Sequence, residues 1–136
     1  MIILVGSPGS GKSTFWKQYL KSHYLRFNND ETGSSKKSES LCLEQLKLGK
    51  SVVVDNTNSK LENRQAFITM AQNQGVKQIR CLYFDVSKEK CMENNALRKV
   101  GTHMSKNVPS VCIHTFFKNH VKPEKKEGFT SDVILI

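Results

Sequence analysis

Short, uninterrupted hydrophobic runs separate longer amphipathic stretches along this 136-residue chain. The four clearest runs cover residues 2–5, 52–54, 81–84 and 133–136, and residues 24–27 form a weaker fifth. None of them alternates polar with apolar positions. Short continuous runs of this kind are typical of strands that are buried on both faces, as in parallel sheets. We therefore predict a parallel sheet of about five strands.

The stretches between these runs have the spacing of amphipathic helices. One helix is predicted after the first strand, one over residues 41–48, and one over 61–74 with Gly75 as its stop. Ser87 is predicted to cap a fourth helix that runs to about residue 99, and Ser110 a fifth that continues to about residue 119. Alternating strands and helices predict an α/β fold with right-handed crossovers. Two polar stretches, residues 28–40 and 101–109, are predicted to be loops long enough to carry function.

The length of the chain fits a single domain over residues 1–136. No apolar run approaches the ~20 residues that span a bilayer, and the first run is too short for a signal peptide. We therefore expect an intracellular protein without a membrane partner, in the nucleus or the cytoplasm. The four cysteines are scattered without a C-x-x-C pair, which indicates neither a zinc site nor a disulfide framework.

The charge balance changes this picture. Lysine and arginine number 21 against 12 acidic residues, which gives a net charge of +9. Such an excess in a small domain favours a polyanionic partner, most often nucleic acid. Many lysine-rich domains have no such partner, so the charge becomes informative only beside a site.

A phosphate-binding pattern follows the first strand directly. Gly6-Ser7-Pro8-Gly9-Ser10-Gly11-Lys12-Ser13, with Thr14 after it, matches the Walker A pattern G-x-x-x-x-G-K-[ST] and opens an amphipathic helix. Glycines let successive backbone N–H groups face phosphate oxygens, and the start of the helix adds its positive dipole end. Lys12 is predicted to reach the β- and γ-phosphates of ATP, and the Ser13 hydroxyl to bind Mg²⁺.

Two of the four aspartates stand where a phosphotransferase needs a carboxylate. Asp30 follows the weak strand at residues 24–27, and Asp55 ends the strand at 52–54. Ligands of open α/β sheets bind beyond the carboxyl ends of the strands, so Asp30 can serve as general base and Asp55 can hold Mg²⁺ or orient substrate. A turn or a helix cap is the alternative role for both.

Several motifs together resemble one family. The opening GSPGSGKST, then Asn29-Asp30-Glu31-Thr32-Gly33-Ser34, then Asp55-Asn56-Thr57-Asn58, with Asn94-Asn95 and Glu127-Gly128-Phe129 later on, resemble the kinase domain of polynucleotide kinase 3′-phosphatase over essentially the whole chain. The D-N-T-N element is the most discriminating part, because many P-loop kinases share the first motif alone.

The resemblance implies a P-loop kinase fold with a lid near residues 100–108, and it implies specific roles. Asp30 falls on the general base that activates the 5′-hydroxyl of DNA or RNA. Asp55 and Asn56 fall on the element that supports the substrate end, and Arg64 falls on a basic position of the next helix. Arg98 falls on the arginine segment that leads into the lid, where an arginine neutralises charge on the transferred phosphoryl group.

Other residues bear on the substrate and on the extent of the protein. Lys36, with Lys37, comes soon after Asp30 and is predicted to follow a nucleic-acid backbone. The chain departs from the family at Asn29 and Ala96, where the family carries arginines, and at Ser35, where an aromatic residue is common. It has no D-x-D motif for phosphatase chemistry, so it is predicted to be a stand-alone kinase or part of a longer repair protein.

Two alternatives stay open at this point. One is a kinase of a small metabolite or of a tRNA-linked hydroxyl on the same fold. The other is a nucleic-acid-binding module that binds nucleotide without turnover, which the departures at Asn29 and Ala96 suggest. Production of ADP separates both kinase hypotheses from the binding module.

Overall fold

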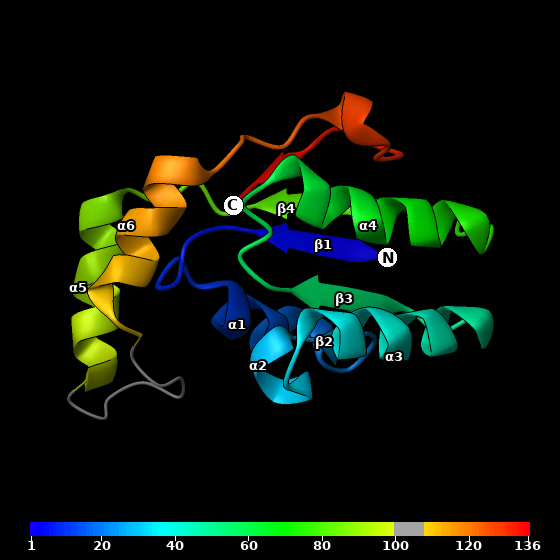
Figure 1. Cartoon of the computed structure of the whole chain (residues 1–136), viewed down its shortest axis with the longest axis horizontal. Helices are drawn as coiled ribbons and strands as arrows, with labels where there is room; N and C mark the ends of the chain where they lie inside the picture. The colour runs from blue at the N-terminus through cyan, green and yellow to red at the C-terminus, as the bar shows by residue number, and fades with distance from the viewer. Residues whose placement is uncertain (100–107) are drawn as a thin grey trace.

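A computed structural model describes residues 1–99 and 108–136 of the chain (Figure 1). Its five strands form one parallel sheet in the order β2-β3-β1-β4-β5. The strands are β1 (Ile2–Val5), β2 (Leu25–Phe27), β3 (Val52–Asp55), β4 (Arg80–Tyr83) and β5 (Ile134–Leu135). The predicted α/β sheet is confirmed, and the weak candidate at residues 24–27 is its edge strand beside β3.

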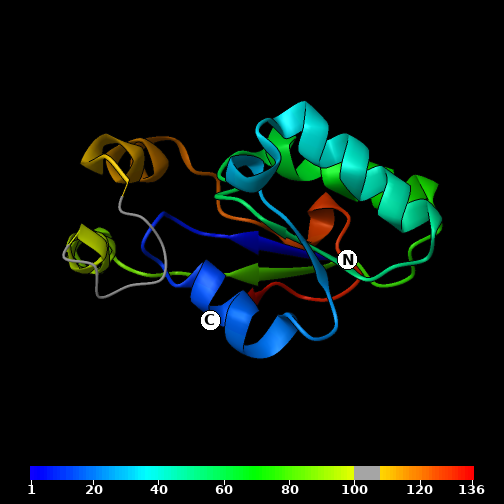
Figure 2. The ribbon, with the colours of Figure 1, turned by 90° about the horizontal axis from the view of Figure 1, so that it is seen from below.

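Helices cover both faces of the sheet, as the uninterrupted apolar strands predict. On one face lie α3 (Ser35–Lys47) and α4 (Leu61–Asn73), and on the other lie α1 (Lys12–Phe15) and the π-helical turn η1 (Trp16–Leu20), as Figure 2 shows. Successive residues of a strand point to opposite faces. Ile3 therefore packs toward α3 and α4, whereas Leu4 packs toward α1 and η1, and both are fully buried.

The last strand differs from its prediction. We expected the run at residues 133–136 to be buried on both faces, but Ile134 and Leu135 are 43% and 59% exposed. The reason is its position in the sheet: β5 pairs only with β4 and forms an edge. A continuous apolar run does not by itself distinguish a central strand from an edge strand.

The predicted loop at residues 28–40 is also wrong, because most of it is helical. A short helix α2 (Asn29–Thr32) is followed at once by α3. The side chain of Asn28 accepts hydrogen bonds from the first N–H groups of α2, and Ser34 does the same for α3. Asparagine and serine are strong N-cap residues, so the polar composition marks two helix starts instead of an open loop.

Two helices and a short turn complete the chain. The helices α5 (Lys88–Lys99) and α6 (Ser110–Asn119) lie side by side beyond the carboxyl ends of the strands (Figure 1), and the 3₁₀ turn η2 (Lys125–Glu127) precedes β5. Ser87 caps α5 as predicted, since its Oγ accepts from Lys90 N at 3.2 Å. Pro109, and not Ser110, holds the cap position of α6. The predicted lid at residues 100–108 lies outside the described residues except for Val108.

The cysteines are free thiols. Cys42, Cys81 and Cys91 are buried and Cys112 is exposed. Burial raises the pKa of Cys42 and of Cys81 to about 12, so both remain protonated at neutral pH. Within the described residues no helix has the length and apolar character needed to cross a membrane.

Candidate functional site

A cavity of about 690 Å³ opens where the strands β1, β2 and β3 end. Its walls come from the loop after β1, from the residues that follow β2, from the end of β3, and from Arg98 on α5. This is the edge of a parallel α/β sheet at which ligands bind. The cavity brings Lys12, Ser13, Asp30 and Asp55 together, which are four of the residues predicted from the sequence.

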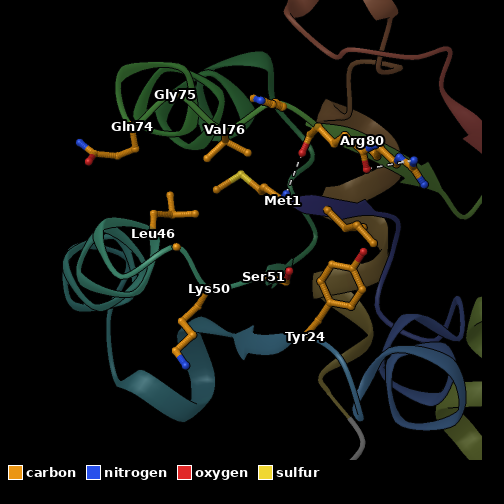
Figure 3. A pocket seen from close by; sticks show the side chains of 13 residues that line it. Met1, Tyr24, Leu46, Lys50, Ser51, Gln74, Gly75, Val76 and Arg80 are labelled. Atoms are coloured by element: carbon orange, nitrogen blue, oxygen red, sulfur yellow. Dashed lines mark hydrogen bonds between the residues drawn. The ribbon is translucent and has the colours of Figure 1, made fainter.

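A second cavity of about 310 Å³ lies at the opposite end of the sheet (Figure 3). Met1, Tyr24, Leu46, Lys50 and Arg80 are among the residues that line it. None of its lining residues is acidic, so it offers no carboxylate, either as a general base or as a ligand for a metal ion. The carboxylates Asp30 and Asp55, together with Lys12, line the first cavity instead.

The loop over residues 6–14 wraps around the Lys12 side chain. Lys12 Nζ donates to the carbonyl oxygens of Gly6 at 2.8 Å and of Ser7 at 3.0 Å. Pro8, Gly9 and Gly11 line the cavity together with Lys12 and Ser13, whereas Ser7 and Ser10 are buried and Thr14 is exposed on α1. Gly9 and Gly11 have φ angles of 82° and 95°, which residues with a side chain rarely adopt.

The electrostatic state of Lys12 follows from this packing. Burial lowers the pKa of its ammonium group to about 8, against the opposing attraction of Asp55, and the positive charge of Arg98 lowers the pKa further. Lys12 forms no ion pair with an acidic side chain among the described residues, and a polyphosphate in the cavity would provide that anionic partner. The loop therefore has the geometry and the charge of a phosphate site.

Ser13 and Asp55 form the candidate metal site. Ser13 Oγ donates to Asp55 Oδ2 at 3.1 Å, and Asp55 is only 1% exposed. The other carboxylate oxygen, Asp55 Oδ1, is buried without a hydrogen-bond partner among the described residues. A hydroxyl beside a carboxylate with a free oxygen suits Mg²⁺, which prefers oxygen ligands and keeps several of its waters. These residues fit the ion that the sequence predicts.

Arg26 on β2 is a site residue that the sequence analysis missed. Its Nε donates to Asp55 Oδ2 at 2.8 Å, its Nη2 donates to Ser13 Oγ at 2.9 Å, and its Nη1 is paired with Glu31. Its guanidinium carbon also lies 4.8 Å from the centre of the Trp16 ring. A basic residue inside an otherwise apolar edge strand, just before Asn28, is the signal that could have revealed it.

Asp30 stands in the first turn of α2 with its side chain exposed to the cavity. Asn28 positions it, because Asn28 Oδ1 accepts from Asp30 N at 2.9 Å while Asn28 Nδ2 donates to Asp55 O at 2.6 Å. The ends of β2 and β3 are thereby tied together. The Asp30 carboxylate accepts no hydrogen bond from the residues that the structure describes, which leaves it open to an incoming hydroxyl.

The D-N-T-N element ties three strand ends to each other. Asn56 exchanges hydrogen bonds with Asn29, Thr57 O accepts from Gly6 N at 3.1 Å, and Asn58 Nδ2 donates to Leu4 O at 2.7 Å. Asn58 has a φ of 46°, in the left-handed region that asparagine tolerates better than most residues. The motif thus holds the phosphate loop and the Asp30 turn in fixed positions.

The helix α5 closes the cavity on the other side. Arg98 lines it, and its Nε is buried without a partner among the described residues. Burial lowers the pKa of Arg98 from its ordinary value. Asn94 Nδ2 donates to Gly9 O at 2.8 Å, and an added Cβ at Gly9 would lie 2.4 Å from Cys91 O. The contact between α5 and the phosphate loop therefore requires glycine at position 9.

Two predicted substrate residues lie elsewhere. Lys36 is exposed in the first turn of α3 and does not line the cavity. Arg64 is fully buried, with Nε at 2.7 Å and Nη2 at 2.6 Å from the two carboxylate oxygens of Glu127. Its Nη1 donates to the carbonyl oxygens of Asn58 and Val121. We therefore assign Arg64 a structural role in place of the predicted substrate contact.

Comparisons with known proteins identify what this chain is similar to. A family model described as an AAA domain matches residues 28–122. The chain is 36% identical over 132 residues to a bifunctional polynucleotide phosphatase/kinase of Schizosaccharomyces pombe, covering 96% of this chain and 32% of that protein. It is 33% identical over 133 residues to an Acanthamoeba polyphaga mimivirus protein whose name carries the same two activities, covering 95% and 31%.

Solved structures show the same fold. The structure of Chaetomium thermophilum Kti12 in complex with ADP-AlF3 has a TM-score of 0.75 and 19% sequence identity, and the match covers 99% of this chain and 87% of that chain. The chain spans about a third of the length of these two polynucleotide phosphatase/kinase relatives.

Proposed function

Because this chain belongs to the AAA domain family and has relatives named as polynucleotide phosphatase/kinases, we propose that it is an ATP-dependent polynucleotide 5′-hydroxyl kinase. It transfers the γ-phosphoryl group of ATP to the 5′-hydroxyl end of DNA or RNA, in the repair of strand ends. One observation carries the proposal: the exposed carboxylate of Asp30 faces the same cavity as Lys12 of the phosphate loop.

The phosphate loop binds the donor. The backbone of residues 6–14 surrounds the β-phosphate, and Lys12 exchanges its carbonyl partners for oxygens of the β- and γ-phosphates. Ser13 and Asp55 would hold Mg²⁺, and the bound ion would supply positive charge that neutralises the phosphates. Arg98 approaches from α5 and stabilises the negative charge that the transferred group carries in the transition state.

Asp30 acts on the acceptor. Its carboxylate accepts the proton of the 5′-hydroxyl as the hydroxyl oxygen forms a bond to the γ-phosphorus. As that bond forms, the bond between the γ-phosphorus and the β–γ bridging oxygen breaks. ADP leaves with the electron pair of the broken bond. Asn28 and Asn56 keep the turn that carries Asp30 in register with the phosphate loop, so the reaction depends mainly on positioning.

The charge of the chain supports a polyanionic acceptor. The net charge is +9, and Lys36 and Lys37 are exposed at the start of α3, a few residues after Asp30. Contacts between lysine and backbone phosphates do not depend on base sequence, which suits an enzyme that acts on strand ends of any sequence. Asp55 and Asn56 complete the cavity wall beside Asp30 and orient the residues that face the substrate end.

The test is a transfer assay with γ-labelled ATP, Mg²⁺ and a 5′-hydroxyl oligonucleotide. A matched oligonucleotide that already carries a 5′-phosphate is the control. We expect label only on the 5′-hydroxyl strand, with an initial rate that falls as salt increases. Transfer to a free small hydroxyl compound instead would point to a metabolite kinase. Binding of ATP without production of ADP would point to a nucleotide-dependent binding module.

A further inference from the structure

The position beside Ser13 and Asp55 is held by the guanidinium of Arg26. Its Nη2 lies 2.9 Å from Ser13 Oγ and 2.7 Å from Asp55 Oδ2. We propose that Arg26 takes the place of Mg²⁺ on the Ser13–Asp55 pair before nucleotide binds, and that it swings toward Glu31 when the metal–nucleotide complex enters. The inference rests on the proposed nucleotide site and is independent of which acceptor is phosphorylated.

The two cations exclude each other for reasons of both geometry and charge. Asp55 Oδ2 already accepts hydrogen bonds from Arg26 Nε and from Ser13 Oγ, besides its contact with Arg26 Nη2. A magnesium ion needs oxygen ligands at about 2.0–2.1 Å in near-octahedral geometry. The Arg26 guanidinium covers Ser13 Oγ and Asp55 Oδ2, which leaves Asp55 Oδ1 as the one oxygen of the pair without a partner among the described residues. The pair is poorly solvated, since the side chains of Arg26 and Asp55 are 15% and 1% exposed, so two adjacent cations would repel strongly.

A place for the displaced guanidinium already exists. Arg26 Nη1 is paired with Glu31, whose side chain is 57% exposed and which follows Asp30 directly. A rotation of the outer side-chain bonds of Arg26 keeps this ion pair while it releases Ser13 and Asp55. The movement leaves a positive charge beside Asp30, on the wall of the cavity that faces the acceptor. Arg26 is thus a positioning residue that links metal entry to the acceptor side.

The protein contains an internal reporter of this movement. Trp16 is the only tryptophan of the chain, and the Arg26 guanidinium carbon lies 4.8 Å from the centre of its ring. A cation over an indole ring interacts with the ring electrons, so its departure changes the environment that the fluorophore senses. The emission of Trp16 therefore reports the position of Arg26 without any enzymatic turnover.

The first measurement is the emission of Trp16 during titration with ADP alone, Mg²⁺ alone and Mg·ADP. In the unaltered protein we expect Mg·ADP to change the emission by more than ADP alone does. In Arg26→Gln the two responses should coincide, because no cation leaves the ring. A Trp16→Phe protein defines the background. Equal responses to ADP and Mg·ADP in the unaltered protein would overturn the proposal.

The second measurement is direct binding of Mn²⁺, a paramagnetic substitute for Mg²⁺, in the absence of nucleotide. We expect Arg26→Gln to bind Mn²⁺ at least about tenfold more tightly than the unaltered protein, since a competing charge is gone. Arg26→Lys, which keeps the charge, should stay close to the unaltered protein. Equal Mn²⁺ affinities of Arg26→Gln and the unaltered protein would contradict the exchange.

Both experiments omit the acceptor, so they separate this inference from the proposed function. A protein that exchanges Arg26 for the metal but does not phosphorylate oligonucleotides would support the inference and refute the polynucleotide substrate. If Arg26→Gln does not fold, as judged by circular dichroism, the emission titration of the unaltered protein decides the question. A lack of any ADP binding to the unaltered protein would refute the nucleotide site and the inference together.

Discussion

Asn29 and Asn56 are joined by a pair of reciprocal hydrogen bonds between the ends of β2 and β3. Asn56 Oδ1 accepts from Asn29 N at 2.8 Å, and Asn56 Nδ2 donates to Asn29 Oδ1 at 3.2 Å. The residue next to Asn29 is Asp30, the proposed base. The position of that carboxylate relative to the phosphate loop therefore depends on an amide of a neighbouring strand.

Replacement of Asn56 by alanine should disturb this position without touching the donor site. We expect kcat to fall by about 10- to 100-fold, because a misplacement on the order of 1 Å at a reacting group has effects of this size. The KM for ATP should stay nearly unchanged. Steady-state kinetics with a 5′-hydroxyl oligonucleotide measure both. Asn73→Ala, which removes an exposed amide at the end of α4, is the matched control. A fall in ATP affinity equal to the fall in kcat would contradict the positioning role.

Removal of the Asp30 carboxylate should affect the chemical step alone. We expect Asp30→Ala to lower turnover by about 10²- to 10⁴-fold, the usual contribution of a general base. The affinity for ATP, measured by calorimetry, should remain close to that of the unaltered protein. Asp132→Ala serves as control, because the Asp132 side chain is 90% exposed and does not line the cavity. A near-normal rate in Asp30→Ala would contradict the assignment of Asp30 as the general base.

The lowered pKa of Lys12 predicts how nucleotide affinity depends on pH. In the free protein the pKa is about 8, and bound phosphates favour the ammonium form and raise it. Affinity is therefore highest below pH 8 and falls as the pH rises above that value, by at most about tenfold per pH unit. Calorimetry in buffers of different ionisation enthalpy should show proton uptake on binding that grows between about pH 7 and pH 9.

The variant that tests this assignment is Lys12→Ala. We expect it to lose both nucleotide affinity and turnover, and to lose the proton uptake on binding as well. Proton uptake that persists in a Lys12→Ala protein that still binds ATP would assign the titration to another group. Retained activity in that variant would contradict the phosphate cradle itself.

The buried pair of Arg64 and Glu127 should matter for stability. Glu127→Ala leaves the guanidinium of Arg64 buried without its carboxylate, which costs about 3–5 kcal/mol in comparable cases. Urea unfolding followed by circular dichroism measures the change in the free energy of unfolding. Glu93→Ala removes the exposed pair with Lys90 and should cost at most about 1 kcal/mol. Equal and small losses in the two variants would show that Arg64 finds other partners.

Contiguous features were predictable from the sequence. The phosphate loop lies in one segment whose backbone geometry its own glycines permit, and four of the five strands have uninterrupted apolar runs. The resemblance to polynucleotide kinase 3′-phosphatase is confirmed by relatives named as bifunctional polynucleotide phosphatase/kinases. The prediction of a loop over residues 28–40 was wrong, because Asn28 and Ser34 cap helices there. Helix caps and polar loops have the same composition.

Arg26 and Arg64 show what a linear pattern does not reveal. Arg26 is a neighbour of Asp55 only because β2 lies beside β3 in the sheet. Arg64 occupies a helix position that suggested a substrate contact, yet the fold turns it inward onto Glu127, 63 residues later. In both cases the partner of the charge is supplied by a distant segment, and no local rule identifies that segment.

The sequence by itself determined the α/β class, the phosphate loop around Lys12 and the candidate carboxylates Asp30 and Asp55, because these depend on local backbone preference and on residue chemistry. The tertiary structure alone decided that β3 lies between β1 and β2, which carries Asp55 and Asn56 to the phosphate loop and to the Asp30 turn. It also placed Arg26 on the metal-binding pair. Pairing between strands distant in sequence, with the burial of charge that follows, is a property of the folded sheet and not of any single segment.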